Sequence, residues 1–216
     1  MRLYISSFRL GNQPQKLVEL VADKMQALVI ANACDLSIPR VRRKRLEREL
    51  TALRGLGFQA EELDLRDYFA KDREGPRLRA RLEPHGLIWV RGGNPFVLRR
   101  AMRQSGFDTA LRDLLHKDAL VYGGYSGGIA VMGPTLHGVE LVSDPKTVPT
   151  GYDPDIIWEG LGLLDYSLAP HYRCNHPASP AIEGVVDYLV AHRIPHRTLR
   201  DGEAILMTDA GETFLS

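Results

Sequence analysis

One serine in this sequence stands on a glycine-rich turn that could carry a nucleophile. Residues 124–128 read Gly-Tyr-Ser-Gly-Gly, which matches the pattern G-x-S-x-G, and they follow an apolar run at 120–122 and precede a plausible helix start at Ile129. A sharp strand-to-helix turn of this kind leaves room only for very small neighbours and pushes the serine hydroxyl into solvent. It also points the N–H of Gly127 toward the place where a negative oxygen forms during acyl transfer. The pattern therefore predicts that Ser126 is a nucleophile.

Two other interpretations of this turn compete with the nucleophile hypothesis. A glycine-rich strand-to-helix turn can have no chemical role, and it can also cradle a phosphate group. The phosphate interpretation fits poorly, because the chain has no Walker lysine after these glycines and no GxGxxG opening its first strand-helix unit. A lone GxSxG arises often by chance, so the nucleophile hypothesis needs a second feature.

A second glycine-rich loop supplies that feature. An apolar run at 87–90 leads into the sequence Arg-Gly-Gly-Asn-Pro at 91–95, where the proline suits the first turn of a helix. Because the carboxyl ends of parallel strands meet at one edge of a sheet, both loops are expected at the edge where ligands bind. Gly93 could then offer an oxyanion a second backbone N–H beside that of Gly127. The same residues also fit an ordinary helix N-cap turn.

Composition and charge exclude several classes of protein. The chain has 216 residues, of which 44% are hydrophobic and 25% charged, and this balance suits a globular protein with a sizeable core. Its 28 Lys+Arg and 27 Asp+Glu give a net charge of +1, so no overall positive field attracts nucleic acid or an anionic membrane. The basic run at 40–45 is followed by acidic residues and by leucines at helical spacing, so we interpret it as a solvated helix face.

The number of cysteines and the length of the apolar runs indicate where in the cell the protein is located. Cys34 and Cys174 are too few for a disulfide scaffold and lack the CxxC or Cys/His spacing of a zinc site. The N-terminal residues do not resemble a signal peptide, and the longest apolar runs are far shorter than the ~20 residues of a membrane-spanning helix. The sequence therefore predicts a soluble, cytoplasmic protein without a metal ion.

The pattern of apolar residues predicts the elements that hold these candidate residues. Short apolar runs at 3–6, 27–31, 60–65, 87–90 and 119–122 alternate with helical patterns. Such alternation is typical of a parallel sheet that helices cover on both faces. Prolines and glycines at 133–162 predict loops or short antiparallel strands near the edge of the sheet, and a helix at 182–192 and a strand at 204–208 complete the chain. Residues 1–216 contain no repeat and no linker, so we expect a single domain.

The two loops and two later segments together resemble the dipeptidase E and cyanophycinase family of serine peptidases. The resemblance rests on Gly-Gly-Asn at 92–94, the turn at 124–128, the segment 160–164 leading to Ala-Pro-His-Tyr at 169–172, and Arg-Asp-Gly-Glu-Ala-Ile at 200–205. It implies a fold of the class I glutamine amidotransferase type, similar to flavodoxin, which is a three-layer, doubly wound α/β fold with a mostly parallel sheet. It also implies a peptidase that uses neither a cofactor nor a metal ion.

The resemblance implies a role for each residue of the site: Ser126 as nucleophile, His171 as general base, and the N–H groups of Gly93 and Gly127 as the oxyanion hole. The residues alone leave both His171 and His176 open as the base, because both lie in the stretch that best suits the sheet edge. The family pattern points to Asp201 as the carboxylate that orients the histidine. We prefer Asp201 because it begins the last predicted strand, a rigid place from which to hold an imidazole tautomer. Asp144, in the loop after the elbow helix, is its rival.

Two departures from the family pattern bear on the reaction. Gly127 stands where the family usually has alanine, which is sterically harmless but loosens the turn. An arginine-bearing stretch follows the histidine in dipeptidase E, whereas this chain has Cys-Asn-His-Pro-Ala-Ser-Pro at 174–180, so we expect no strict preference for Asp-X dipeptides. Arg91, Arg173 and Asn94 stay as candidates for binding the substrate, the two arginines because a guanidinium can bind a carboxylate bidentately.

The sequence as a whole predicts a serine hydrolase that cleaves a peptide bond in small peptides or dipeptides. One alternative is an α/β-hydrolase-type esterase, which shares GxSxG but has its acid before its histidine in chain order. Another alternative is a catalytically silent, amidotransferase-like protein that only binds a small molecule or a partner. An active glutamine amidotransferase is disfavoured, because that chemistry uses a cysteine at the elbow. The expected partner is a small peptide, with no nucleic acid, and a homodimer is left open.

Overall fold

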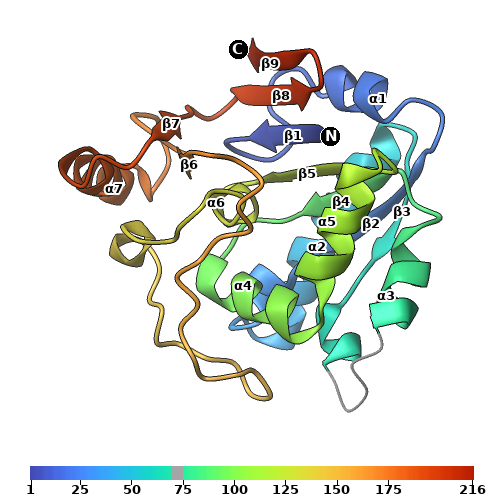
Figure 1. Ribbon diagram of the computed structural model, residues 1–216, viewed down its shortest axis with the longest axis horizontal. Coiled ribbons are helices and arrows are strands. Elements are labelled where there is room, and N and C mark those ends of the chain that lie inside the picture. The colour runs from blue at the N-terminus through green and yellow to red at the C-terminus, as the bar shows by residue number, and fades with distance from the viewer. Residues whose placement is uncertain (70–74) are drawn as a thin grey trace.

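A sheet of seven strands forms the centre of the protein (Figure 1). In this computed structural model, which describes residues 1–69 and 75–216, the strands lie in the order β3-β2-β4-β5-β1-β8-β9. They are β1 (Arg2–Ser6), β2 (Gln26–Ile30), β3 (Gln59–Glu62), β4 (Leu87–Val90), β5 (Val121–Tyr125), β8 (Ala204–Thr208) and β9 (Gly211–Leu215). The strands from β3 to β1 pair in parallel, whereas β8 pairs antiparallel with β1 and β9 antiparallel with β8. The prediction of a mostly parallel sheet is confirmed.

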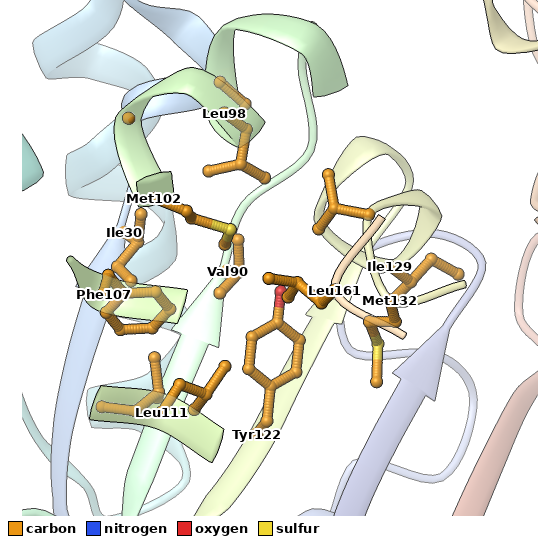
Figure 2. Packing of buried hydrophobic residues seen from close by; sticks show 14 of the residues in the cluster. Ile30, Val90, Leu98, Met102, Phe107, Leu111, Tyr122, Ile129, Met132 and Leu161 are labelled. Atoms are coloured by element: carbon orange, nitrogen blue, oxygen red, sulfur yellow. The ribbon is translucent and has the colours of Figure 1, made fainter. Parts of the chain in front are cut away.

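Helices cover both faces of this sheet. They are α1 (Gln15–Val21), α2 (Pro39–Gly55), α3 (Gly75–Leu82), α4 (Pro95–Gln104), α5 (Phe107–His116) and the short α6 (Gly127–Ala130). A further helix, α7 (Ser179–Ala191), lies outside these layers and has an apolar cluster of its own (Figure 1). The buried side chains of α1 and α2 form the core on one face, and those of α3, α4 and α5 form the core on the other (Figure 2). The predicted three-layer arrangement is therefore confirmed. No helix in the described ranges is both long enough and apolar enough to span a bilayer.

The alternating side chains of β4 explain why the sheet needs two helical layers. Ile88 and Val90 belong to the core under α4 and α5, whereas Leu87 and Trp89 belong to the core under α1 and α2. All four side chains are fully buried. Apolar side chains on both faces of a strand must both be buried, so the sheet needs a layer of helices on each face. Strands of a parallel sheet therefore appear in the sequence as continuous apolar runs.

Several strand boundaries differ from the prediction. β5 continues to Tyr125, because Gly123 has no side chain and the ring of Trp89 occupies the space beside it. β3 ends at Glu62, and Leu65 begins a short 3₁₀ helix, η2 (Leu65–Tyr68). Three strands were not predicted. These are β9, whose side chains are mostly exposed, and the pair β6 (Ser167–Ala169) and β7 (His196–Thr198), each three residues long.

Residues 133–162 form an irregular segment that crosses the protein beside α4. Their regular structure consists of one antiparallel bridge between Thr135 and Glu159 and the 3₁₀ helix η3 (Val139–Leu141). The fully buried Arg100 of α4 holds the segment, because its guanidinium donates hydrogen bonds to backbone carbonyls at 145, 154 and 155. A loop without its own sheet is therefore kept in place by side chains of a neighbouring helix.

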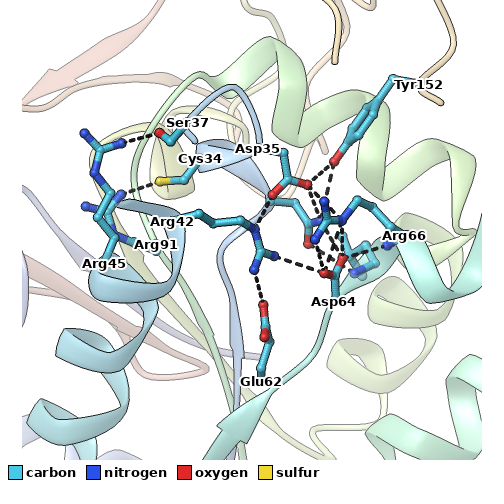
Figure 3. A network of polar contacts seen from close by, with 12 residues as sticks. Cys34, Asp35, Ser37, Arg42, Arg45, Glu62, Asp64, Arg66, Arg91 and Tyr152 are labelled. Carbon is cyan, nitrogen blue, oxygen red and sulfur yellow. Dashed lines mark hydrogen bonds and ion pairs between the residues drawn. The ribbon is translucent and has the colours of Figure 1, made fainter. Parts of the chain in front are cut away.

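A network of charged residues at the carboxyl ends of β2 and β3 fastens the same segment at a second point (Figure 3). Arg42 of α2 bonds the carboxylates of Asp35, Glu62 and Asp64 over distances of 2.5, 2.7 and 3.1 Å. The hydroxyl of Tyr152 donates a hydrogen bond to Asp35. The interpretation of residues 40–45 as a solvated face is therefore wrong for Arg42, whose side chain is only 11% exposed.

The close packing of α6 against β4 can be tested by substitution of a glycine in α6. A Cβ at Gly128 would lie 2.3 Å from the carbonyl oxygen of Val90, whereas a Cβ at Gly55 would meet nothing within 4 Å. Gly128→Ala should lower the free energy of unfolding by about 1–3 kcal/mol, because backbone must shift to admit the methyl group. Gly55→Ala should leave the stability unchanged or raise it by up to about 1 kcal/mol. Urea denaturation of both variants measures the difference, and equal stabilities would contradict the packing.

Candidate active site

The turn between β5 and α6 holds Ser126 in a strained backbone conformation. Its φ and ψ are 54° and −125°, a combination that costs a residue with a side chain on the order of 1–3 kcal/mol. The N–H of Ser126 donates a hydrogen bond to the carbonyl of Ser7, and its own carbonyl accepts from the N–H groups of Ile129 and Ala130. These bonds fix the turn, so the half-buried side chain projects from a rigid support at the carboxyl edge of the sheet.

The loop after β4 lies directly against this turn. A Cβ at Gly92 would lie 2.6 Å from the Cβ of Ser126, and a Cβ at Gly127 would lie 2.4 Å from the carbonyl oxygen of Gly93. Contacts this short leave no space for any side chain, so both loops need glycine at these positions. In the described parts of the chain, the N–H groups of Gly93 and Gly127 have no hydrogen-bond acceptor. Two unused donors therefore lie close to the serine.

His171 follows the short strand β6 and bonds Asp201, which precedes β8. The Nδ1 atom of His171 lies 2.6 Å from the Oδ1 atom of Asp201. Ser7, at the end of β1, connects the two residues, because its hydroxyl accepts a hydrogen bond from the His171 N–H and donates one to the Asp201 carboxylate. The imidazole is therefore held in position by its own backbone, by a carboxylate and by a fully buried serine.

The second ring nitrogen of His171 is free for chemistry. The residue is only 2% exposed, and its Nε2 atom has no hydrogen-bond partner in the described part of the protein. With Nδ1 donating to Asp201, Nε2 carries the lone pair that a general base needs. Burial lowers the pKa of His171 below its ordinary value of 6.5, and the hydrogen bond and negative charge of Asp201 oppose that shift. The ring is therefore kept neutral at neutral pH.

Two aromatic contacts fix the plane of this imidazole. The ring of His176 stacks on that of His171, with centroids 3.7 Å apart and planes inclined by 7°, and Phe8 meets both rings edge-on at 5.8 and 5.5 Å. From its place in the sequence, His176 was only an alternative base, and Phe8 carried no functional signal. The structure makes both residues the packing partners of His171. No sequence signal links residue 8 to residue 171, because only the fold brings them together.

His171, His176 and Asp201 also form the one group of three potential metal ligands found among the described residues. Their ligand atoms lie within 4.8 Å of one another. The two imidazole planes are nearly parallel, however, so their lone pairs do not converge on one point as a tetrahedral site requires. The Nδ1 atom of His176 is already occupied, since it accepts a hydrogen bond from the N–H of Ala178. The arrangement suits stacking and hydrogen bonding better than it suits metal binding.

A small cavity of about 70 Å³ joins the serine to the histidine. Its walls come from the two glycine loops, η3 and the residues after it, β6 and α7. The lining residues are Gly93, Pro95, Ser126, Gly127, Ala130, Val139, Val142, Ser143, Leu168, Pro170, His171, His176, Ala178, Ile182 and Val185. Ser126, His171, Gly93 and Gly127, which the sequence analysis singled out separately, thus face one space.

The carboxylate of the rival acid Asp144 makes no hydrogen bond or ion pair to His171 in the described part of the protein. Its exposed carboxylate accepts hydrogen bonds from the N–H of Lys146 and the hydroxyl of Thr147, over 2.9 and 2.5 Å. These bonds lower its pKa. Asp144 therefore closes its own turn, and it is Asp201 that bonds His171.

The candidate substrate-binding residues are also engaged elsewhere. Arg91 is buried, and it bonds the Cys34 sulfur at 2.6 Å and pairs with Glu49 at 3.4 Å. The amide of Asn94 caps α4 through its oxygen and donates to the backbone carbonyl of Asp144 through its nitrogen. The side chain of Arg173 is 59% exposed and lies 3.6 Å from Glu183. None of the three residues lines the cavity that Ser126 and His171 share.

Comparison with known proteins finds two peptidases among the relatives of this chain. A curated relative named "Probable alpha-aspartyl dipeptidase" from Drosophila melanogaster is 28% identical over 159 residues, covering 71% of this chain and 59% of the relative. Peptidase E of Streptomyces coelicolor is 28% identical over 137 residues, covering 60% of this chain and 51% of its own. The chain thus spans between half and three fifths of the length of these relatives.

Solved structures show the same fold. A Listeria monocytogenes EGD-e protein, provisionally assigned as peptidase E, superposes with a TM-score of 0.78 at 20% identity, covering 100% of this chain and 98% of its own. A peptidase from an acI-B1 actinobacterium gives a TM-score of 0.69 at 14% identity, with coverages of 100% and 87%. The sequence model of Peptidase family S51 matches residues 19–214, which is most of the chain. The chain belongs to Peptidase family S51.

Proposed function

We propose that this protein is a serine peptidase that hydrolyses small peptides. The observation that carries the proposal is that His171 lines the same cavity as Ser126 and has an Nε2 atom without a partner in the described part of the protein, while Asp201 holds Nδ1. The names of the relatives, an alpha-aspartyl dipeptidase and a peptidase E, support short peptides as the class of substrate.

The first half of the proposed reaction forms an acyl-enzyme. His171 Nε2 takes the proton of the Ser126 hydroxyl while Oγ attacks the carbonyl carbon of the peptide bond. The negative oxygen of the tetrahedral intermediate accepts hydrogen bonds from the N–H groups of Gly93 and Gly127, whose unused state supports this role. The imidazolium then gives its proton to the nitrogen of the leaving amine, and the C–N bond breaks.

The second half of the reaction releases the acid product. A water molecule loses a proton to His171 Nε2 and attacks the ester carbon, the same two N–H groups hold the oxyanion, and the ester bond to Ser126 breaks as Oγ regains a proton. Asp201 stabilises the imidazolium in both halves and fixes its tautomer. No step needs a metal ion or an organic cofactor.

The alternatives are less well supported. An α/β-hydrolase esterase has its acid before its histidine, whereas here Asp201 follows His171 in the chain. A glutamine amidotransferase would use a cysteine at the elbow, where this chain has Ser126. Both of its cysteines are free thiols, which agrees with our proposal of a cytoplasmic location. Our proposal includes no nucleic-acid partner and leaves a homodimer open.

Replacement of the nucleophile is the direct test. Ser126→Ala should lower kcat for peptide hydrolysis by on the order of 10⁴-fold or more, and it should abolish labelling by a fluorophosphonate probe. Ser143→Ala is the matched control, because Ser143 lines the same cavity but does not stand on the strained turn between β5 and α6, and it should keep both properties. Activity of Ser126→Ala within tenfold of the parent protein would contradict the proposal.

The choice between the two carboxylates gives a second prediction. Asp201→Asn should lower kcat by on the order of 10⁴-fold, because an amide cannot hold the correct tautomer of His171 or stabilise its charge. Asp144→Asn should stay within twofold of the parent, since the Asp144 carboxylate accepts hydrogen bonds from its own turn and none from His171 in the described part of the protein. Steady-state kinetics on one dipeptide substrate compare the two variants, and the opposite ranking would assign the acid to Asp144.

The pH dependence of kcat/KM provides a third prediction. His171 acts as a base only when neutral, and burial lowers its pKa below 6.5. The value of kcat/KM should therefore rise with pH through one ionisation below pH 6.5 and stay constant from there to about pH 8. EDTA should leave kcat unchanged. A profile without an acidic limb, or a loss of activity on chelation, would refute the metal-free mechanism.

A further inference from the structure

The cavity beside Ser126 is lined mainly by aliphatic side chains. Aliphatic side chains come from three directions: Ile182 and Val185 from α7, Val139 and Val142 from η3 and the residue that follows it, and Ala130 from α6. Ile182 and Val185 are buried and belong to a small apolar cluster of α7. Most of the surface beside the nucleophile is therefore aliphatic.

No carboxylate, lysine or arginine side chain belongs to this lining, which consists wholly of described residues. Its titratable residues are His171 and His176, and each already has partners in the stack and in hydrogen bonds. The two nearby arginines lie outside the lining, Arg91 paired with Glu49 and Arg173 with Glu183. A carboxylate placed in this cavity would lose its water without gaining a cation, which is strongly unfavourable.

The position of the cavity identifies the part of the substrate that would enter it. Ser126, Gly93 and Gly127 all line the cavity, so a carbonyl that Ser126 attacks lies beside it. The side chain of the residue that carries this carbonyl can then enter the cavity. Its volume of about 70 Å³ is several times the ~10–15 Å³ that one water molecule needs on the same measure, which suits a side chain of a few carbon atoms better than an aromatic ring.

We propose that this cavity selects a short aliphatic side chain, such as that of valine, on the residue whose carbonyl Ser126 attacks. This inference rests on the proposed peptidase function and specifies its substrate. It also separates the chain from its Drosophila relative, whose name specifies an aspartyl substrate. Val142 is a specificity-determining residue in this view, because it is half-buried on an irregular loop and can change without breaking a helix or strand.

The first experiment measures kcat/KM for Val-Leu, Ala-Leu, Phe-Leu and Asp-Leu under identical conditions. Val-Leu should exceed both Asp-Leu and Phe-Leu at least tenfold, and Ala-Leu should lie between Val-Leu and Asp-Leu. This comparison uses the unaltered protein and depends on no variant. Asp-Leu cleaved as fast as Val-Leu would overturn the specificity and leave the peptidase function standing. Cleavage of none of the four would contradict the proposed function and the specificity together.

The second experiment places a cation in the cavity wall. Val142→Arg should raise the ratio of kcat/KM for Asp-Leu to that for Val-Leu at least tenfold, because a guanidinium can bind the substrate carboxylate. Leu141→Arg makes the same change one residue earlier, on a side chain that is 54% exposed and outside the lining, and it should leave the ratio within twofold. Circular dichroism confirms that both variants fold. Equal ratios in two folded variants would show that the cavity does not select the side chain.

Discussion

The contact between two glycine loops is the constraint on which the rest of the site depends. The turn that holds Ser126 and the loop after β4 approach so closely that a methyl group at Gly92 or Gly127 would overlap the other loop. This approach is possible because β4 and β5 are neighbours in the parallel sheet and end at the same edge. Backbone N–H groups from both loops can then lie beside one hydroxyl, which no pair of side chains would hold as rigidly.

The parallel part of the sheet and the glycines around Ser126 could be predicted from the sequence. Apolar runs such as 87–90 coincide with a strand because each residue must be buried on one of two covered faces. The glycines near Ser126 were visible because a close approach of backbones allows no other residue. Such local requirements leave a signature in consecutive residues, whereas β6, β7 and β9 leave little, being short or mostly exposed.

Contacts between distant residues were beyond the reach of the sequence. Ser7 bridges His171 and Asp201 across separations of 164 and 194 residues, and nothing in its neighbours distinguishes it from an ordinary serine. Arg42 belongs to a run of cations that reads as a solvated face, and only the fold brings three carboxylates to it. Arg91 had the right charge for a substrate, but Glu49 lies beneath it and engages it inside the protein. Charge alone does not predict which ion pairs are internal.

The bridge made by Ser7 has a consequence for the order in which the protein can assemble. Ser7 precedes its partner Asp201 by 194 residues, so a ribosome makes the two residues at widely separated times. A nascent chain can fold β1 to β5 and already present Ser126 on its turn, but it cannot orient the imidazole until residue 201 has emerged. Contacts of such long sequence separation form late in folding. The turn that carries Ser126 is therefore synthesised well before the carboxylate that holds the His171 imidazole.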